Sequence, residues 1–296
     1  MKYRMLGKTG LRVSVVGIGT WQLAGVWDKQ FSLAEVEALF REAGDLGINV
    51  VDTAECYGDH EAERFIGQCI RNERERWIVA TKFGHNVANG LGDENFGPDQ
   101  VQIQLEASLR SLGTDYIDVY QMHSARNEQF NNDALWTMLD KQVQAGKVRF
   151  LGNSLLMPQM RNQIEKSEEY GISVLQTTYN AIQTKAAETA LPIASALDLG
   201  VIVREPLASG FLTGKYRPGH RFGPNDVRAM RPAERIDESL SAALAALEAK
   251  PADLEPAAWA NAWCLRERAV STVVPGIKSV EQLRQNALAW ELLEDG

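Results

Sequence analysis

The segment INVVDTAECYG, residues 48–58, is the most informative stretch of the chain for the fold. Its first half is a short run of β-branched apolar residues, which is typical of a strand buried on both faces of a parallel sheet. A helix is expected before it, because Ser32 and Glu35 form a capping box, an apolar stripe follows, and Gly47 supplies the stop. A second amphipathic helix, with Phe65 on its apolar face, is expected after it. The segment therefore predicts a unit of alternating helix and parallel strand.

The same alternation continues in both directions along the chain. Besides VVDT, seven apolar runs are predicted to be strands: VVGIGT, WIVATKF, IDVYQMH, VRFLG, SVLQTTY, GVIVREPL and STVVPG. Amphipathic patterns separate them, for example the one that carries Leu105 and Leu109 and ends at Gly113. An open, doubly wound sheet would show the same local pattern, but eight strands favour closure. The chain is therefore expected to be an α/β protein, a (β/α)8 TIM barrel.

The N-terminal residues predict an addition to the barrel. YRM and LRVS flank the turn sequence LGKTG, so residues 3–14 are expected to form a β-hairpin that closes the bottom of the barrel. No linker or internal repeat divides the chain, and residues 1–296 are expected to form one domain. The longest interval between predicted strands, from Leu207 to Ser271, includes LASGFLTGKYRPGHRFG. A loop of this length is expected to carry function.

Charge and cysteine content disfavour several classes of protein. A formal net charge of −8 opposes binding to nucleic acid or to an anionic membrane, since both need clustered lysine and arginine. No signal peptide and no run of about 18 apolar residues is found, so a cytoplasmic protein is expected. The three cysteines, Cys56, Cys69 and Cys264, lack the spacing of a disulfide framework or zinc site, and Cys56 is interpreted as a small core filler. The oligomeric state stays open.

Four familiar site motifs are incomplete in this sequence. VVGIGTWQ has Gln22 where the dinucleotide-binding fingerprint needs its third glycine, and Lys2 stands at the first glycine of a P-loop that LGKT would end. HEAER places Arg64 where a zinc protease needs histidine, and GNSLL places Leu156 at the second glycine of a nucleophile elbow. No metal site is predicted, and a dinucleotide would have to bind in another way.

Ionisable side chains follow three successive predicted strands. Asp52 ends INVVD, with Tyr57 in the loop after it, Lys82 ends WIVATK, and His123 ends IDVYQMH. The carboxyl ends of parallel strands meet on one face of a barrel, so these side chains are expected to lie together. Each alone has an ordinary explanation, such as a helix cap for Asp52 or a solvated strand end for Lys82, but their joint spacing predicts a catalytic site. The remaining histidines carry no such signal: His60, His85 and His220.

These residues lie in motifs that resemble the aldo-keto reductases: DTAECYG, ATKFG, VYQMH, LQTTYN, PLASGFLTGKY and VPGIKSVEQLRQN. The resemblance covers almost the whole chain and implies a (β/α)8 barrel that binds NADP(H) without a Rossmann domain. It also implies an oxidoreductase that transfers a hydride between nicotinamide and an aldehyde, a ketone or the corresponding alcohol. The catalytic tetrad of the family corresponds to Asp52, Tyr57, Lys82 and His123.

Each member of this tetrad has an expected role. Reduction leaves negative charge on an oxygen that must be protonated, and Tyr57 is expected to be the general acid, or the base in the reverse direction. The Lys82 ammonium is expected to favour the ionised form of Tyr57, and Asp52 to hold Lys82 in place. His123 is expected to hydrogen-bond the carbonyl oxygen and orient it.

The resemblance also implies a set of cofactor contacts. The nicotinamide is expected against Ser154 and Gln176, the pyrophosphate under the loop from Pro206 to Lys215, and the ribose phosphate near Lys278 at a helix start. The expected contacts are Gly19, Thr20, Trp21, Asp52, Ser154, Gln176, Arg204, Pro206, Leu207, Ser209, Gly210, Leu212, Lys215, Gly276, Lys278, Gln282 and Asn286.

Three positions depart from the pattern of the family. Leu155 replaces an asparagine that many relatives use to grip the carboxamide, and Arg204 replaces an aromatic residue on which the nicotinamide often stacks. A guanidinium plane can also stack, or it can contact substrate or phosphate. No arginine lies near Gln282, where relatives that prefer NADP often have one. NADP(H) is expected, with NAD(H) as the alternative.

Substrate and activity are less closely defined. Trp21, Trp27, Phe83 and Phe222 are the expected apolar walls, and the expected partner is a small aldehyde, ketone or sugar-derived carbonyl. One alternative is a regulatory protein of the same fold that binds the cofactor without significant turnover, which the complete tetrad disfavours. The other is a lyase or isomerase that uses Lys82 as a Schiff base, which would leave Tyr57 and the PLASG loop unexplained.

Overall fold

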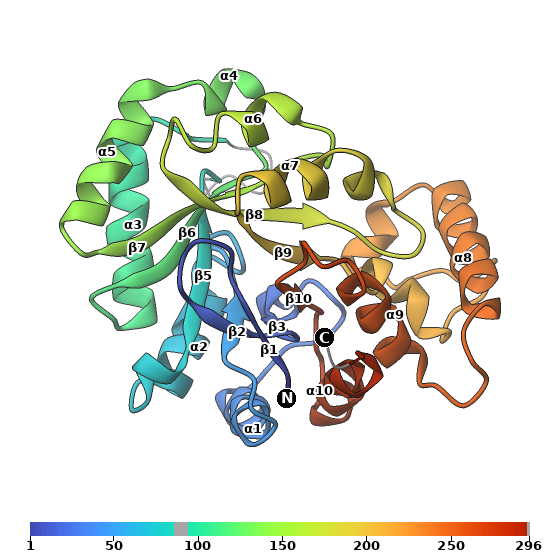
Figure 1. The fold of residues 1–296 in the computed structure, drawn as a ribbon. Coiled ribbons are helices and arrows are strands. Elements are labelled where there is room, and N and C mark those ends of the chain that lie inside the picture. The colour runs from blue at the N-terminus through green and yellow to red at the C-terminus, as the bar shows by residue number, and fades with distance from the viewer. Residues whose placement is uncertain (86–93, 295–296) are drawn as a thin grey trace.

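The computed structural model describes residues 1–85 and 94–294, and its centre is an eight-stranded parallel sheet. The strands are β3 (Ile18–Gly19), β4 (Val50–Asp52), β5 (Ile78–Phe83), β6 (Ile117–His123), β7 (Val148–Ser154), β8 (Ile172–Thr178), β9 (Gly200–Arg204) and β10 (Thr272–Val274). Each strand pairs with the next in the chain, and parallel bridges from Val16 to Val273 and from Gly19 to Gly276 join the first strand to the last. The sheet is therefore closed, which confirms the predicted (β/α)8 barrel and excludes the open doubly wound sheet (Figure 1).

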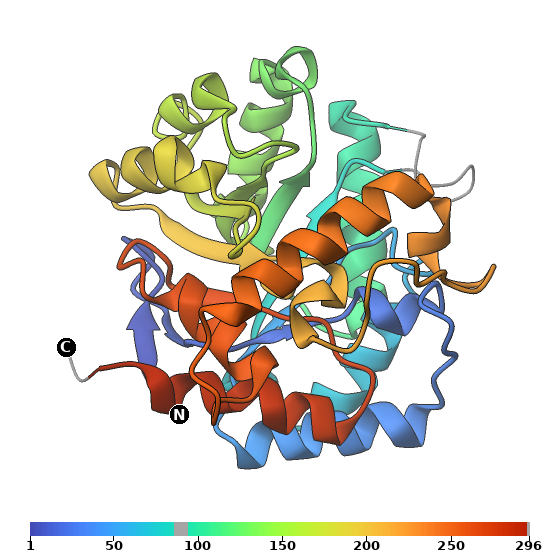
Figure 2. The same ribbon diagram turned by 90° about the vertical axis from the view of Figure 1, so that its right-hand side faces the viewer.

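Helices cover the outside of this barrel, as two views at right angles show (Figures 1 and 2). α1 begins as predicted, because the Ser32 hydroxyl accepts the amide of Glu35 and the Glu35 carboxylate accepts the amide of Ser32. The α-helices are α1 (Leu33–Asp45), α2 (Glu61–Ile70), α3 (Pro98–Leu112), α4 (Asn127–Phe130), α5 (Asp133–Gln144), α6 (Arg161–Glu165), α7 (Ala190–Ala196), α8 (Ala233–Glu248), α9 (Pro256–Leu265) and α10 (Val280–Ala287). None of the helices in the described residues is long and apolar enough to span a bilayer.

The N-terminal hairpin closes the bottom of the barrel, as predicted. β1 (Tyr3–Met5) and β2 (Arg12–Ser14) pair antiparallel. Leu6, Leu11 and Val13 pack in one buried cluster with barrel residues Val50, Ile78, Ala80, Val119, Val174, Ile202 and Val274. The fit is close, because a Cβ atom at Gly200 would lie 2.5 Å from the side chain of Leu6. The hairpin is therefore part of the apolar core.

Strand alternation decides which side chains face the barrel interior. Val50 and Ala80 lie in the inner cluster with the hairpin, whereas their neighbours Val51 and Val79 pack in the outer cluster against the helices. Because side chains two positions apart share a face, Asp52 lies on the same face as Val50, and Lys82 on that of Ala80. The same rule gives Gln121 and His123 the face of Val119, Gln176 that of Val174, and Arg204 that of Ile202. The strands that are apolar at the bottom are therefore polar at the top.

The long interval between β9 and β10 is mostly helical. It contains the 3-10 turns η5 (Ala208–Thr213) and η6 (Val227–Met230), then α8 and α9. The other 3-10 turns within residues 1–85 and 94–294 are η1 (Trp21–Ala24), η2 (Arg74–Arg76), η4 (Lys185–Glu188) and η7 (Leu288–Leu292). Phe211 and Leu212 of η5 pack against Ile236 and Leu240 of α8 in a small core of their own. This core holds the predicted PLASG loop beside the carboxyl ends of the strands.

Candidate active site

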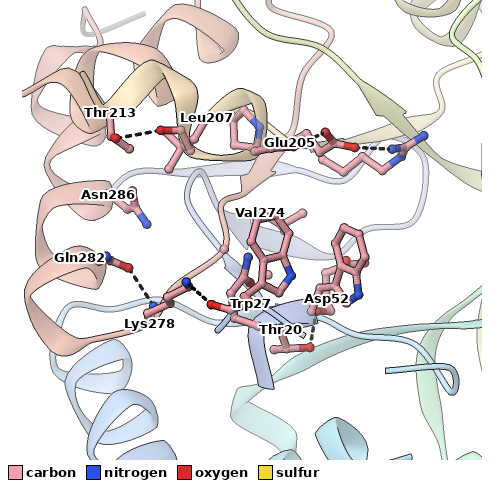
Figure 3. A pocket seen from close by; sticks show the side chains of 18 of the residues that line it. Thr20, Trp27, Asp52, Glu205, Leu207, Thr213, Val274, Lys278, Gln282 and Asn286 are labelled. Atoms are coloured by element: carbon pink, nitrogen blue, oxygen red, sulfur yellow. Dashed lines mark hydrogen bonds and ion pairs between the residues drawn. The ribbon is translucent and has the colours of Figure 1, made fainter. Parts of the chain in front are cut away.

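A cavity of about 570 Å³ opens at the carboxyl ends of the strands. Its size lies within the range of small-molecule and cofactor sites, about 300–1,000 Å³. It runs from α10, which contributes Gln282 and Asn286, to Asp52 and Tyr57 at the mouth of the barrel. Figure 3 shows Lys278, Gln282 and Asn286 on one side and the strand-end residue Asp52 on the other. The cavity is long enough in this direction to join the phosphate and catalytic residues that the sequence predicts.

A buried ion pair lies at the barrel mouth. The Lys82 ammonium donates to the Asp52 carboxylate over 2.8 Å and to the carbonyl of Thr53 over 2.7 Å. The second oxygen of Asp52 accepts the amide of Gln176 over 2.6 Å. Lys82 is fully buried, and a buried ion pair is tolerated only where its remaining hydrogen-bonding groups are satisfied. The network therefore fixes Lys82 next to the loop that carries Tyr57.

The Tyr57 phenol lies above this ion pair. Nζ of Lys82 is 5.3 Å from the centre of the Tyr57 ring. The indole of Trp21 stacks on the same ring, with ring centres 6.1 Å apart. Burial and then the Asp52 carboxylate raise the pKa of Tyr57 well above 10. The net shift is opposite to the lowering expected from Lys82, because burial, the largest cause, disfavours the charged phenolate. The phenol keeps its proton at neutral pH.

His123, at the end of β6, faces the same phenol. The two rings stand edge to face with centres 6.3 Å apart, and Nδ1 of His123 lies 3.7 Å from Sγ of Cys56. Burial and then the charge of Lys82 hold the pKa of His123 well below 6.5, so the imidazole is neutral. Cys56 is thus more than the core filler that the sequence suggests, because its thiol contacts a predicted catalytic side chain.

The four predicted catalytic side chains meet at one mouth. Asp52, Tyr57 and His123 line the cavity, and Lys82 lies directly beneath it in contact with Asp52. A protonated phenol and a neutral imidazole can both donate a hydrogen bond to one oxygen atom placed between them. The arrangement can therefore stabilise and protonate an oxygen that gains negative charge.

Most of the predicted cofactor contacts line the same cavity. They are Gly19, Thr20, Trp21, Asp52, Gln176, Arg204, Pro206, Leu207, Ser209, Gly210, Lys215, Gly276, Lys278, Gln282 and Asn286. Ser154 and Leu212 do not reach it. Ser154 is fully buried and donates to the Gln176 side chain over 3.2 Å, and Leu212 packs toward α8. Ser154 can thus act on a ligand only through Gln176.

The cavity fits a polar ligand with anionic groups. Five buried polar atoms have no hydrogen-bond partner among the described residues and belong to lining residues: Gln22 Oε1, Trp27 Nε1, His85 Nδ1, Arg204 Nε and Asn286 Nδ2. Lys278, Arg228 and Lys215 all line this cavity. Burial and then the charge of Arg228 lower the pKa of Lys278. Ser209 and Gly210, with φ of 59° and 87°, turn the backbone beside this cationic end. Phosphate groups would find cations and close backbone there.

The two departures at Leu155 and Arg204 form one structural feature. The Arg204 guanidinium donates to the carbonyl oxygen of Leu155 over 2.9 Å and pairs with the Glu205 carboxylate over 3.0 Å. The Leu155 side chain points away from the barrel interior into a buried apolar cluster. The backbone oxygen of Leu155 therefore holds Arg204 at the cavity wall, although the side chain of Leu155 offers no hydrogen bond.

Two of the predicted substrate walls are wrong. Trp21 and Trp27 line the cavity and contact each other edge to face, with ring centres 5.1 Å apart. Phe83 is fully buried and packs on Tyr120, because it follows the inward-facing Lys82 and so points outward. Phe222 does not line the cavity; its ring packs on the guanidinium of the lining residue Arg228, 3.8 Å from the ring centre.

Sequence reasoning missed several lining residues, among them His85, Glu205 and Arg228. Glu205 directly follows β9 and His85 lies two residues after the end of β5, so the strand-end rule that found Asp52 could have found them. Arg228 lies in the short 3-10 turn η6, where the sequence shows no periodicity. It is buried in an ion pair with Asp226 at 2.6 Å and in ring contacts with Trp27, and no sequence signal marks it.

The fold and the cavity define the class of protein: a (β/α)8 barrel with buried ionisable groups at the carboxyl ends of its strands, where barrel enzymes have their active sites. The model of the Aldo/keto reductase family matches residues 15–295, and the chain belongs to this family. Membership supports NAD(P)H-dependent carbonyl reduction in general.

Relatives and solved structures agree with this assignment. An uncharacterized oxidoreductase of Bacillus subtilis, YrpG, is 31% identical over 100% of this chain and 93% of its own length. L-glyceraldehyde 3-phosphate reductase of Escherichia coli O157:H7 is 30% identical over 98% of this chain and 87% of its own. The holo form of the aldo-keto reductase AKR11C1 from Bacillus halodurans superposes with a TM-score of 0.82 at 27% identity, covering 98% of this chain and 91% of that one. The similarity thus extends over the whole barrel.

Proposed function

We propose that residues 1–296 form one domain that reduces a small aldehyde or ketone with NADP(H), with Tyr57 as the general acid. The observation that carries the proposal is the meeting of the Tyr57 phenol, the Lys82–Asp52 ion pair and the His123 imidazole at one mouth. In the reverse direction the same groups would serve alcohol oxidation, with Tyr57 as the base.

The chemistry follows from the protonation states of the residues. A bound nicotinamide would supply the hydride. The phenol, whose pKa lies well above 10, gives its proton to the oxygen as negative charge develops there. The neutral imidazole of His123 donates a hydrogen bond to the same oxygen, and the nearby ammonium of Lys82 stabilises the phenolate that remains. Asp52 holds Lys82 in position.

The cofactor proposal rests on the cations at the α10 end of the cavity. Lys278, Lys215 and Arg228 line the cavity there, and α10 begins at this end with Ser279 as its N-cap. These groups favour the additional phosphate of NADP(H) over NAD(H). At the other end, Gln176 and Arg204 are the proposed contacts for the nicotinamide, and Arg204 takes the place of the missing aromatic ring.

The cavity wall favours a small substrate. Trp21, Trp27 and His85 border the space next to Tyr57 and His123, so apolar area and a hydrogen-bonding ring are both available. The name of the Escherichia coli relative, L-glyceraldehyde 3-phosphate reductase, supports a small hydroxylated carbonyl compound as the first class to test.

A carbonyl panel with NADPH and NADH in parallel tests the proposal. We expect oxidation of NADPH with an activated aldehyde, and we expect Tyr57→Phe to lower kcat by about a hundredfold or more while cofactor binding survives. Tyr120→Phe is the matched control, because the Tyr120 hydroxyl is buried outside the cavity without a hydrogen-bond partner among the described residues. Equal turnover of wild type and Tyr57→Phe would refute the role of Tyr57.

A further inference from the structure

The thiol of Cys56 and the imidazole of His123 form a neutral pair. Sγ lies 3.7 Å from Nδ1, and Cys56 is 8% exposed. Burial raises the pKa of the thiol to about 12 and is also the largest cause that holds the pKa of His123 well below 6.5. Near pH 7 the contact therefore joins a protonated thiol to a neutral imidazole, and it is no thiolate–imidazolium pair.

This contact decides which ring nitrogen of His123 carries the proton. An unprotonated imidazole nitrogen is a good acceptor, whereas sulfur is a weak one, so the favoured bond runs from the S–H group of Cys56 to Nδ1. The proton of the imidazole then lies on Nε2. The two nitrogens lie on opposite sides of the ring, and Nε2 is left for an oxygen atom in the cavity that His123 lines.

We propose that Cys56 is a positioning residue, whose hydrogen bond to Nδ1 holds His123 in the Nε2–H tautomer that donates to the substrate oxygen. The other groups that face His123 do not supply this bond. Lys82 and Arg204 act on it as cations, and the ring of His85 stands edge to face with its centre 4.7 Å away. Without the thiol, Nδ1 loses its partner, and the Nδ1–H tautomer, in which Nε2 cannot donate, becomes populated.

Two substitutions separate the hydrogen bond from packing. Cys56→Ser keeps a donor, and Cys56→Val keeps an apolar side chain of similar size without one. Nitrogen-15 NMR of the full chain with labelled histidine reads the tautomer, and His123→Gln assigns the signals of His123 among the four histidines. We expect an unprotonated Nδ1 in the wild type and in Cys56→Ser, and a raised share of the Nδ1–H tautomer in Cys56→Val. A wild-type spectrum with the proton on Nδ1, or identical spectra in all three proteins, would overturn the proposal.

Turnover gives a second measure, which rests on the proposed reductase function. A hydrogen bond of this kind contributes about a factor of ten, so Cys56→Val is expected to lower kcat about tenfold with an unchanged KM for the cofactor. Cys56→Ser is expected to recover most of that loss. Equal kcat values in the two variants would contradict the proposal. A chain without any turnover would refute the reductase function alone, because the NMR experiment reads the tautomer without a reaction.

Discussion

The two ends of the barrel interior are built from the same strands but differ in chemistry. At the bottom, Val50 and Ala80 pack against Leu6 of the hairpin in a solid apolar cluster. Two residues further along the same strands, Asp52 and Lys82 form a buried ion pair below an open cavity. Apolar burial stabilises the fold in proportion to area, whereas buried charges cost stability unless they are paired. The comparison indicates that the bottom holds the barrel together and the top carries the reaction.

The largest effect is expected from a change that removes the charge at the top. Lys82→Met leaves the Asp52 carboxylate buried without its counterion, so we expect about a thousandfold loss of kcat and a loss of about 3–5 kcal/mol in the free energy of unfolding. Lys147→Met is the control, because Lys147 pairs with Glu106 at the surface and such pairs contribute at most about 1 kcal/mol. Denaturant unfolding and steady-state kinetics check both variants. Similar losses of kcat and of unfolding free energy in the two would show that the buried pair contributes no more than the surface pair.

A change at the bottom should separate stability from activity. Leu6→Ala opens a cavity between the hairpin and Gly200, and we expect it to lower the free energy of unfolding by about 2–5 kcal/mol while kcat below the unfolding transition stays unchanged. Met5→Ala alters a neighbouring side chain that is 53% exposed and should change stability by less than about 0.5 kcal/mol. A loss of kcat in folded Leu6→Ala would show that the two ends of the barrel are not independent.

The effect that is smallest per step concerns an acid beside the top of the barrel, whose charge changes the stability gradually with pH. The Glu55 carboxylate accepts the amides of Gly84 and His85, and burial raises its pKa from 4.5 to about 8. Between those values the folded protein keeps a proton that the unfolded chain has released, so the free energy of unfolding falls as the pH rises. The slope is at most about 1.4 kcal/mol per pH unit.

Glu55→Gln keeps the amide acceptor and removes the titration, so it should flatten this dependence. Unfolding measured in denaturant at several pH values between 5 and 8 checks the slope. Wild type and Glu55→Gln with parallel stability profiles would contradict the buried, protonated state of Glu55.

The sequence predicted the barrel and the ring of strand-end residues because both depend on local pattern. Buried parallel strands leave continuous apolar runs, and the polar residue that ends each run must lie at the active-site face. Side chains alternate between the two faces of a strand, so the position of Phe83 next to the inward-facing Lys82 would have placed it outside the cavity. Arg228 could not have been predicted, since its ion pair with Asp226 and its place beside Trp27 depend on the path of the chain around the short turn η6.

The order of the strands, the phase of each one and the residue at each strand end can be read from the amino-acid pattern alone. How those residues behave depends on the folded arrangement. It placed Tyr57 where burial raises the pKa that Lys82 was expected to lower, and it turned the Cys56 thiol toward His123. Protonation states depend on desolvation and on distances through space, and neither is encoded in the spacing of residues along the chain.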